Sequence, residues 1–151
     1  MFGYEVHILG DNLEGEARDM AREHATIAKK CPPGTVLLSG GEATVTVAGN
    51  GRGGPNAEYA LALALALNDE GNIWAIACDT DGIDGTEDNA GALVAPDTLA
   101  RATACGEDGI RRLARNDAYG FFESLDDLVV SGPTLTNVND FRAILVTDGH
   151  H

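Results

Sequence analysis

The run of alanine and leucine that ends at Leu67 constrains the fold most strongly. Leucine recurs there at every second position, which is the period of a strand, but alanine rather than a polar residue stands between the leucines. Alanine and leucine are strong helix formers, and residues 58–67 include no β-branched side chain. We therefore expect a helix from Glu58 to Leu67, and its lack of a polar face predicts that it is buried.

Strand and helix patterns alternate on both sides of this helix. We expect strands over 4–9, 35–38, 43–48, 73–78, 90–95, 128–130 and 142–146, and helices over 14–30, from Pro96, over 109–115 and over 118–125. This alternation is typical of the α/β class. We predict a single domain over residues 1–148, built as a layered mixed sheet with packed helices, in which Trp74 belongs to the core. Residues 149–151 are expected to be a tail, either native or the remnant of a tag.

Composition excludes several classes of partner. The 151 residues carry a net charge of −14, which repels nucleic acid and anionic membranes. The sequence has no apolar stretch long enough to span a membrane. Its three cysteines form no C-x-x-C pair, which argues against a zinc site and against a disulfide framework. We therefore expect a cytoplasmic location.

A glycine-rich segment, residues 49–54 with the sequence GNGRGG, precedes the central helix. Glycines allow backbone N–H groups to turn toward an anion, and the N-terminus of a helix adds partial positive charge. Pro55 suits the first helical turn, and the guanidinium of Arg52 suits phosphate or carboxylate. An anion site and a plain connecting turn are both compatible with these residues.

The same segment admits a second interpretation. Gly49, Gly51 and Gly54 fit the G-x-G-x-x-G pattern of dinucleotide-binding proteins, between an expected strand and a helix. That pattern also requires an acidic residue about 20 positions further on, at the end of the next strand. Asp79 ends that strand, but it lies 30 positions after Gly49. The match to the pattern is therefore weak. An NAD(P)-dependent reductase stays open as an alternative, because the three glycines and their place between a strand and a helix still fit.

An acidic cluster follows the strand that is expected to end at Cys78. Its five members lie within ten positions, and they are Asp79, Asp81, Asp84, Glu87 and Asp88. Carboxylates packed together repel one another unless a cation or hydrogen bonds compensate, and such oxygen ligands suit Mg²⁺ or Ca²⁺. The spacing is not that of an EF-hand. The alternative is an acidic turn whose side chains accept local N–H groups.

A polar connection over residues 131–140 is the third candidate. It is rich in hydroxyl and amide side chains, among them Asn137 and Asn139, and it ends at Asp140. Such side chains can orient a polyhydroxylated or phosphorylated ligand, and they can equally form local turns.

Four segments, taken in order, resemble the MOFRL domain. They are residues 38–45 (LSGGEATV), 51–58 (GRGGPNAE), 80–85 (TDGIDG) and 132–140 (GPTLTNVND). This domain is the C-terminal part of the glycerate 2-kinase family, whose bacterial members have often been called hydroxypyruvate reductases. The chain departs from many members at Pro55, where they have arginine, and at Leu135, where they have glycine.

The resemblance implies a function and a set of site residues. The function is phosphorylation of D-glycerate to 2-phosphoglycerate with ATP and Mg²⁺, in a cleft shared with a larger N-terminal Rossmann-like domain. On this basis we expect catalytic roles for Arg52, Asp81 and Asp84, substrate binding by Gly51, Gly53, Gly54, Asn56, Asn137, Asn139 and Asp140, and metal binding by Asp79, Asp81 and Asp84. A non-catalytic module that completes a separate kinase chain, and a homo-oligomer, both stay open.

Overall fold

The computed structural model describes residues 3–68, 70–134 and 139–148. Asn137, one of the residues expected to bind substrate, and the expected tail over 149–151 lie outside the described residues. Among the described residues, no helix is both long and apolar enough to cross a membrane.

The described chain forms one mixed sheet with helices packed on it. The strand order is β1-β2-β6-β3-β4-β5. The strands are β1 (Glu5–Glu16), β2 (Thr35–Thr44), β3 (Ile73–Asp79), β4 (Gly91–Val94), β5 (Leu128–Val129) and β6 (Asp140–Val146). Strands β1 and β2 pair in parallel, and the other neighbours pair antiparallel. The helices are α1 (Ala17–Lys29), α2 (Pro55–Leu67), α3 (Thr98–Ala104), α4 (Gly109–Ala114) and α5 (Ala118–Leu125). The predicted α/β class is thereby confirmed.

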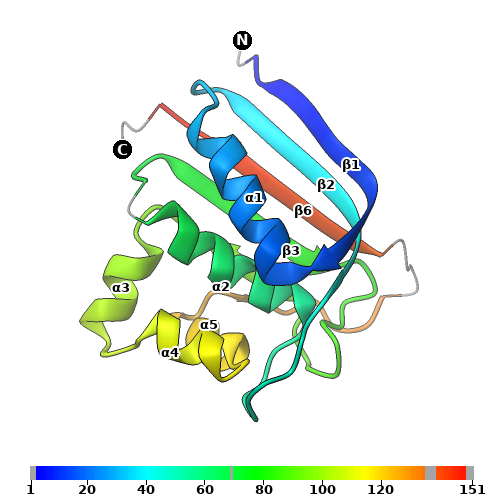
Figure 1. Cartoon of the computed structure of the whole chain (residues 1–151), viewed down its shortest axis with the longest axis vertical. Helices are drawn as coiled ribbons and strands as arrows, with labels where there is room; N and C mark the ends of the chain where they lie inside the picture. Colours follow the sequence, from blue (N-terminus) through cyan, green and yellow to red (C-terminus); the bar gives the residue numbers. More distant parts are fainter. Residues whose placement is uncertain (1–2, 69, 135–138, 149–151) are drawn as a thin grey trace.

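Helix α2 is the central element of the core, as the alanine and leucine pattern predicts. Tyr59, Leu61 and Leu63 are almost fully buried. Figure 1 shows α1 and α2 side by side on one face of the sheet, and α2 also contacts β3 and β4. The helix begins at Pro55, three residues before the expected start, because proline is well placed in a first turn.

Two strands are longer than the sequence indicates. Strand β1 continues to Glu16, so α1 begins at Ala17 rather than at residue 14. Strand β2 runs without a break to Thr44, where we expected one strand over 35–38 and another over 43–48. Gly41 explains the continuity, because a Cβ atom there would lie 2.2 Å from the carbonyl oxygen of Leu13 in β1. Glycine therefore permits the two strands to stay paired through this point.

Candidate functional site

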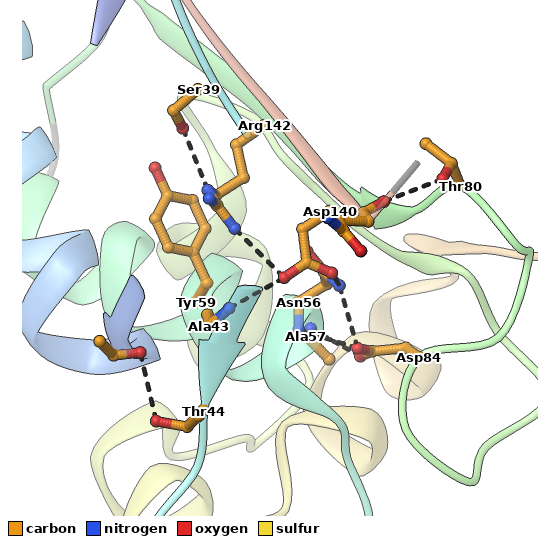
Figure 2. Close-up of polar contacts among 12 residues, drawn as sticks. Ser39, Ala43, Thr44, Asn56, Ala57, Tyr59, Thr80, Asp84, Asp140 and Arg142 are labelled. Carbon is orange, nitrogen blue, oxygen red and sulfur yellow. Dashed lines mark hydrogen bonds and ion pairs between the residues drawn. The ribbon is translucent and has the colours of Figure 1, made fainter. Parts of the chain in front are cut away.

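Segments distant in the sequence meet at one end of the sheet. Strand β2 ends there at Thr44, β3 ends at Asp79 and β6 begins at Asp140. The strand register places Asp140 opposite both Gly41 and Asp79. The start of α2 lies beside these strand ends, as Figure 2 shows. The described parts of the four motifs singled out in the sequence therefore converge on this end of the sheet.

Asp84 occupies the N-terminus of α2. Its Oδ1 atom accepts the backbone N–H of Asn56 at 2.8 Å, and its Oδ2 atom accepts that of Ala57 at 2.8 Å. The side chain is fully buried. Burial raises the pKa of Asp84 to about 6, although the N–H donors act to lower it. The anion at this helix terminus is thus a residue of the chain itself.

Asn56 and Asp140 extend this contact into a buried network. Oδ1 of Asp140 accepts a hydrogen bond from Nδ2 of Asn56 at 2.8 Å, and Oδ2 accepts the backbone N–H of Ala43 at 3.0 Å. The exposed fractions of Asn56 and Asp140 are 1% and 7%. These two residues, which we expected to bind substrate, therefore join α2, β2 and β6 to one another.

Arg142 completes the network and was missed at the level of sequence. Its exposed fraction is 1%, its Nε donates to Oγ of Ser39 at 3.0 Å, and its Nη1 lies 3.4 Å from Oδ2 of Asp140. The guanidinium carbon lies 5.4 Å from the ring centroid of Tyr59, whose hydroxyl is 2.7 Å from Nδ1 of His24. The signal in the sequence is a charged residue at a core-facing position of the expected strand over 142–146.

Asp79 and Asp81 lie together at the end of β3. The backbone N–H of Asp81 donates to Oδ1 of Asp79 at 3.1 Å, and Oδ1 of Asp81 accepts the N–H of Ile83 at 2.8 Å. Burial, followed by the nearby carboxylates of Asp81 and Asp140, raises the pKa of Asp79 to about 6. The acidic segment is therefore a turn with local hydrogen bonds, and it holds two carboxylates close together.

The three aspartates expected to bind metal do not form a single group. Among the residues that the structure describes, no three His, Cys, Asp or Glu side chains are placed to hold a metal ion. Asp84 directs its carboxylate to α2, whereas Asp79 and Asp81 lie at the end of β3. Asp79 and Asp81 are the pair that fits a cation held in part by another molecule, because Mg²⁺ commonly uses one or two carboxylates together with substrate phosphates.

The glycine-rich segment is bound to the turn between α4 and α5. The N–H of Gly51 donates to the carbonyl of Arg115 at 2.9 Å, and the N–H of Arg52 donates to Oδ1 of Asp117 at 3.0 Å. Ten residues separate the end of β2 from the start of α2. The short strand-to-helix turn of dinucleotide-binding proteins is therefore absent from this part of the described chain.

The side chain of Arg52 is exposed. Its Nη2 lies 2.7 Å from Oε2 of Glu87, and its guanidinium carbon lies 4.1 Å from the ring centroid of Tyr119. The hydrogen bond to Glu87 raises the pKa of Arg52. Arg52, which we expected to contact substrate, is thus a cation at the surface, and its ion pair with Glu87 holds it beside the acidic segment.

The polar connection is attached to the same segment. The N–H of Thr134 donates to the carbonyl of Asp81 at 3.0 Å, and the N–H of Thr80 donates to the carbonyl of Asn139 at 3.1 Å. The Asn139 side chain is exposed, and its backbone has a φ of 67°. Asn139 therefore lies beside the end of β3, next to Thr80.

Comparisons with known proteins identify the family of this α/β domain. A model of the MOFRL family matches residues 35–140. The chain belongs to the MOFRL family.

Its relatives are longer proteins. A protein of Agrobacterium vitis that carries the name hydroxypyruvate reductase is 56% identical over 148 residues, which cover 92% of this chain and 34% of that protein. The D-glycerate 2-kinase of Thermotoga maritima is 38% identical over 91% of this chain and 35% of its own length. The crystal structure of glycerate kinase from T. maritima matches with a TM-score of 0.92 and 37% identity, over 96% of this chain and 37% of that one. The chain thus spans about a third of the length of these relatives.

Proposed function

We propose that this chain forms one wall of the active site of a glycerate 2-kinase, which transfers the γ-phosphoryl group of ATP to the 2-hydroxyl of D-glycerate. The other wall would come from the N-terminal Rossmann-like domain of the same family. The observation that carries the proposal is the convergence of the four motifs at one end of the sheet. The name of the T. maritima relative supports the reaction, and the third of its length that this chain matches supports the shared site.

Phosphoryl transfer depends chiefly on positioning the reactants and on neutralising their charge. In our proposal Arg52 supplies positive charge to a carboxylate or phosphate, exchanging Glu87 for the ligand. Asn139 and the glycines at 51, 53 and 54 would line the cleft. Asp84, Asn56 and Asp140 would position the segments that line the cleft without contacting substrate, because their side chains are buried and hydrogen-bonded to one another.

Asp79 and Asp81 would hold Mg²⁺ together with the phosphates of ATP. The observation in favour is that Asp79 and Asp81 lie together at the end of β3, where burial and, after it, the nearby carboxylates raise the pKa of Asp79. When bound, the ion would neutralise phosphate charge. Asp84 is left out of this ligand pair, since its carboxylate accepts hydrogen bonds from the start of α2.

A hydroxypyruvate reductase is the second candidate, and the name of the A. vitis relative is the observation that favours it. A nicotinamide cofactor would need a phosphate-binding turn, and the N-terminus of α2 is occupied by Asp84. We therefore rank the kinase first. The expected cytoplasmic location and the exclusion of nucleic acid stay predictions.

The test uses a chimera in which this chain replaces the matched third of the T. maritima D-glycerate 2-kinase. ³¹P NMR with ATP, Mg²⁺ and D-glycerate should show 2-phosphoglycerate, and the unmodified T. maritima protein is the positive control. This chain alone should give no product, because it supplies one wall only. Oxidation of NADH or NADPH by hydroxypyruvate is measured on the same samples. A folded chimera that consumes the nicotinamide cofactor and forms no 2-phosphoglycerate would replace the kinase assignment with the reductase.

A further inference from the structure

The face of the sheet that lies opposite α1 and α2 is apolar. In β3, buried Ala75 and Ala77 alternate with Trp74 and Ile76, which are partly exposed. Strands β2 and β6 show the same alternation. We define the open sheet face by six of these outward side chains, which are Val36, Leu38, Trp74, Leu93, Phe141 and Leu145. A solvated sheet face normally carries polar residues at such positions.

The strand register makes this face continuous. Leu145 pairs with Val36 on one side and with Trp74 on the other, and Ile76 pairs with Leu93. Trp74, Leu93 and Phe141 have exposed fractions of 41%, 42% and 41%. Contiguous exposed apolar side chains mark interaction surfaces rather than solvated ones.

A hollow of about 500 Å³ lies on this face. Trp74, Leu93 and Leu145 are among the residues that line it. The ion pair between Arg101 and Asp127, with 2.6 Å between Nη2 and Oδ2, stands beside these apolar side chains. The face therefore offers an apolar floor next to a charged border, as interfaces between protein domains do.

We propose that the open sheet face docks the companion part of the glycerate kinase polypeptide, namely the two thirds of its relatives that this chain does not span. The T. maritima structure contains this fold with a TM-score of 0.92 in a chain of which it covers 37%, so the larger part of such a chain lies outside this domain and can cover the face. The location follows from Phe141, which adjoins Asp140, so a body on this face reaches the end of the sheet where the motifs converge. A second copy is disfavoured, because each copy has a net charge of −14.

Hydroxyl-radical footprinting with mass spectrometry tests the docking and rests on the proposed function only for the choice of companion. The chain alone and the T. maritima chimera are compared. Trp74 and Phe141 should be modified readily in the chain alone and about fivefold less in the chimera, as burial in an interface core requires. Ile110 on α4 is 73% exposed and should react equally in both. In the chimera Trp74→Glu should restore modification of Phe141, and the matched control Ile110→Glu should not.

Equal modification of Trp74 in both proteins overturns the proposal. Protection in the chain alone, with a dimer mass in sedimentation, assigns the face to a second copy and also overturns it. If the chimera does not fold, the unmodified T. maritima protein is footprinted at the positions aligned with Trp74 and Ile110, under the same criteria. Protection of Trp74 without formation of 2-phosphoglycerate would keep the docking face and reject the kinase. Formation of 2-phosphoglycerate without protection of Trp74 would keep the kinase and reject the docking face.

Discussion

The side-chain amide of Asn56 lies 2.8 Å from Oδ1 of Asp140 and joins the first turn of α2 to the first residue of β6. The other carboxylate oxygen of Asp140 faces Arg142 and the backbone of Ala43. A single buried carboxylate therefore connects β2, β6 and the first turn of α2.

Removing Asp140 should strongly destabilise the fold. Asp140→Ala leaves Arg142 buried without its carboxylate partner, and breaking a buried pair in this way costs about 3–5 kcal/mol. Urea denaturation measures the free energy of unfolding, and Asp19→Ala on the exposed side of α1 is the control. In a double-mutant cycle, Arg142→Met and Asp140→Ala should not be additive. A loss below about 1 kcal/mol for Asp140→Ala would show that the pair does not stabilise the fold.

Asp84 should give the chain a specific dependence of stability on pH. Its pKa is about 6 when folded, against 3.8 for an unperturbed aspartate. The folded state therefore binds this proton more tightly, so the contribution of Asp84 is greatest below about pH 4 and is lost as the pH rises through about 6. The full difference between the folded and the unperturbed pKa corresponds to about 3 kcal/mol in the free energy of unfolding.

Asp84→Asn cannot ionise, so it tests this dependence. The variant should be less stable than the parent chain at pH 4, because an amide cannot accept both N–H groups of α2 as the carboxyl does. The difference in free energy of unfolding between the two proteins should then narrow toward pH 7. Urea denaturation at three pH values measures the gap. Asp19→Asn should show no such narrowing. A gap that widens with pH would mean that ionised Asp84 is the more stable form in the folded chain.

Gly54 should tolerate no side chain. A Cβ atom at this position would lie 2.5 Å from the backbone of Asp84, so Gly54→Ala should cost about 1–3 kcal/mol or more through overpacking. Gly71→Ala is the matched control, because a Cβ atom there meets no atom within 4 Å. Thermal unfolding of the two variants provides the measurement. Equal melting temperatures would contradict the close approach of α2 to the acidic segment.

Arg52 should affect activity without affecting stability. Its side chain is exposed, so Arg52→Gln should leave the melting temperature unchanged. In the active chimera the same change should lower kcat/KM about tenfold to a hundredfold, since a positive charge at the phosphate or carboxylate would be lost. Glu87→Gln keeps the arginine and frees it, and should not lower kcat/KM. A loss below about threefold for Arg52→Gln would remove Arg52 from the proposed site.

The interpretation of Trp74 shows where the sequence misleads. The apolar run over 73–78 predicts a strand, and β3 is there, but the expected core position of Trp74 is wrong because the side chain is 41% exposed. A continuous apolar run predicts burial on both faces and does not show which partner covers each face. Helix α2 packs on one face of β3, and among the residues that the structure describes no element covers Trp74 on the other face.

The sequence by itself determined the α/β class, the central helix and the family, although not the full extent of β1 and β2. Local preferences suffice for this, since the alanine and leucine run specifies α2 and four ordered motifs identify the MOFRL domain. Only the tertiary structure decided what the polar residues do. Asp84, Asn56 and Asp140 come from segments far apart in the chain. The two carboxylates are bound within the protein because folding brings N–H donors, among them the amide of Asn56, and Arg142 to them. Pairing between distant segments leaves no periodic trace in the sequence, so only the folded structure shows it.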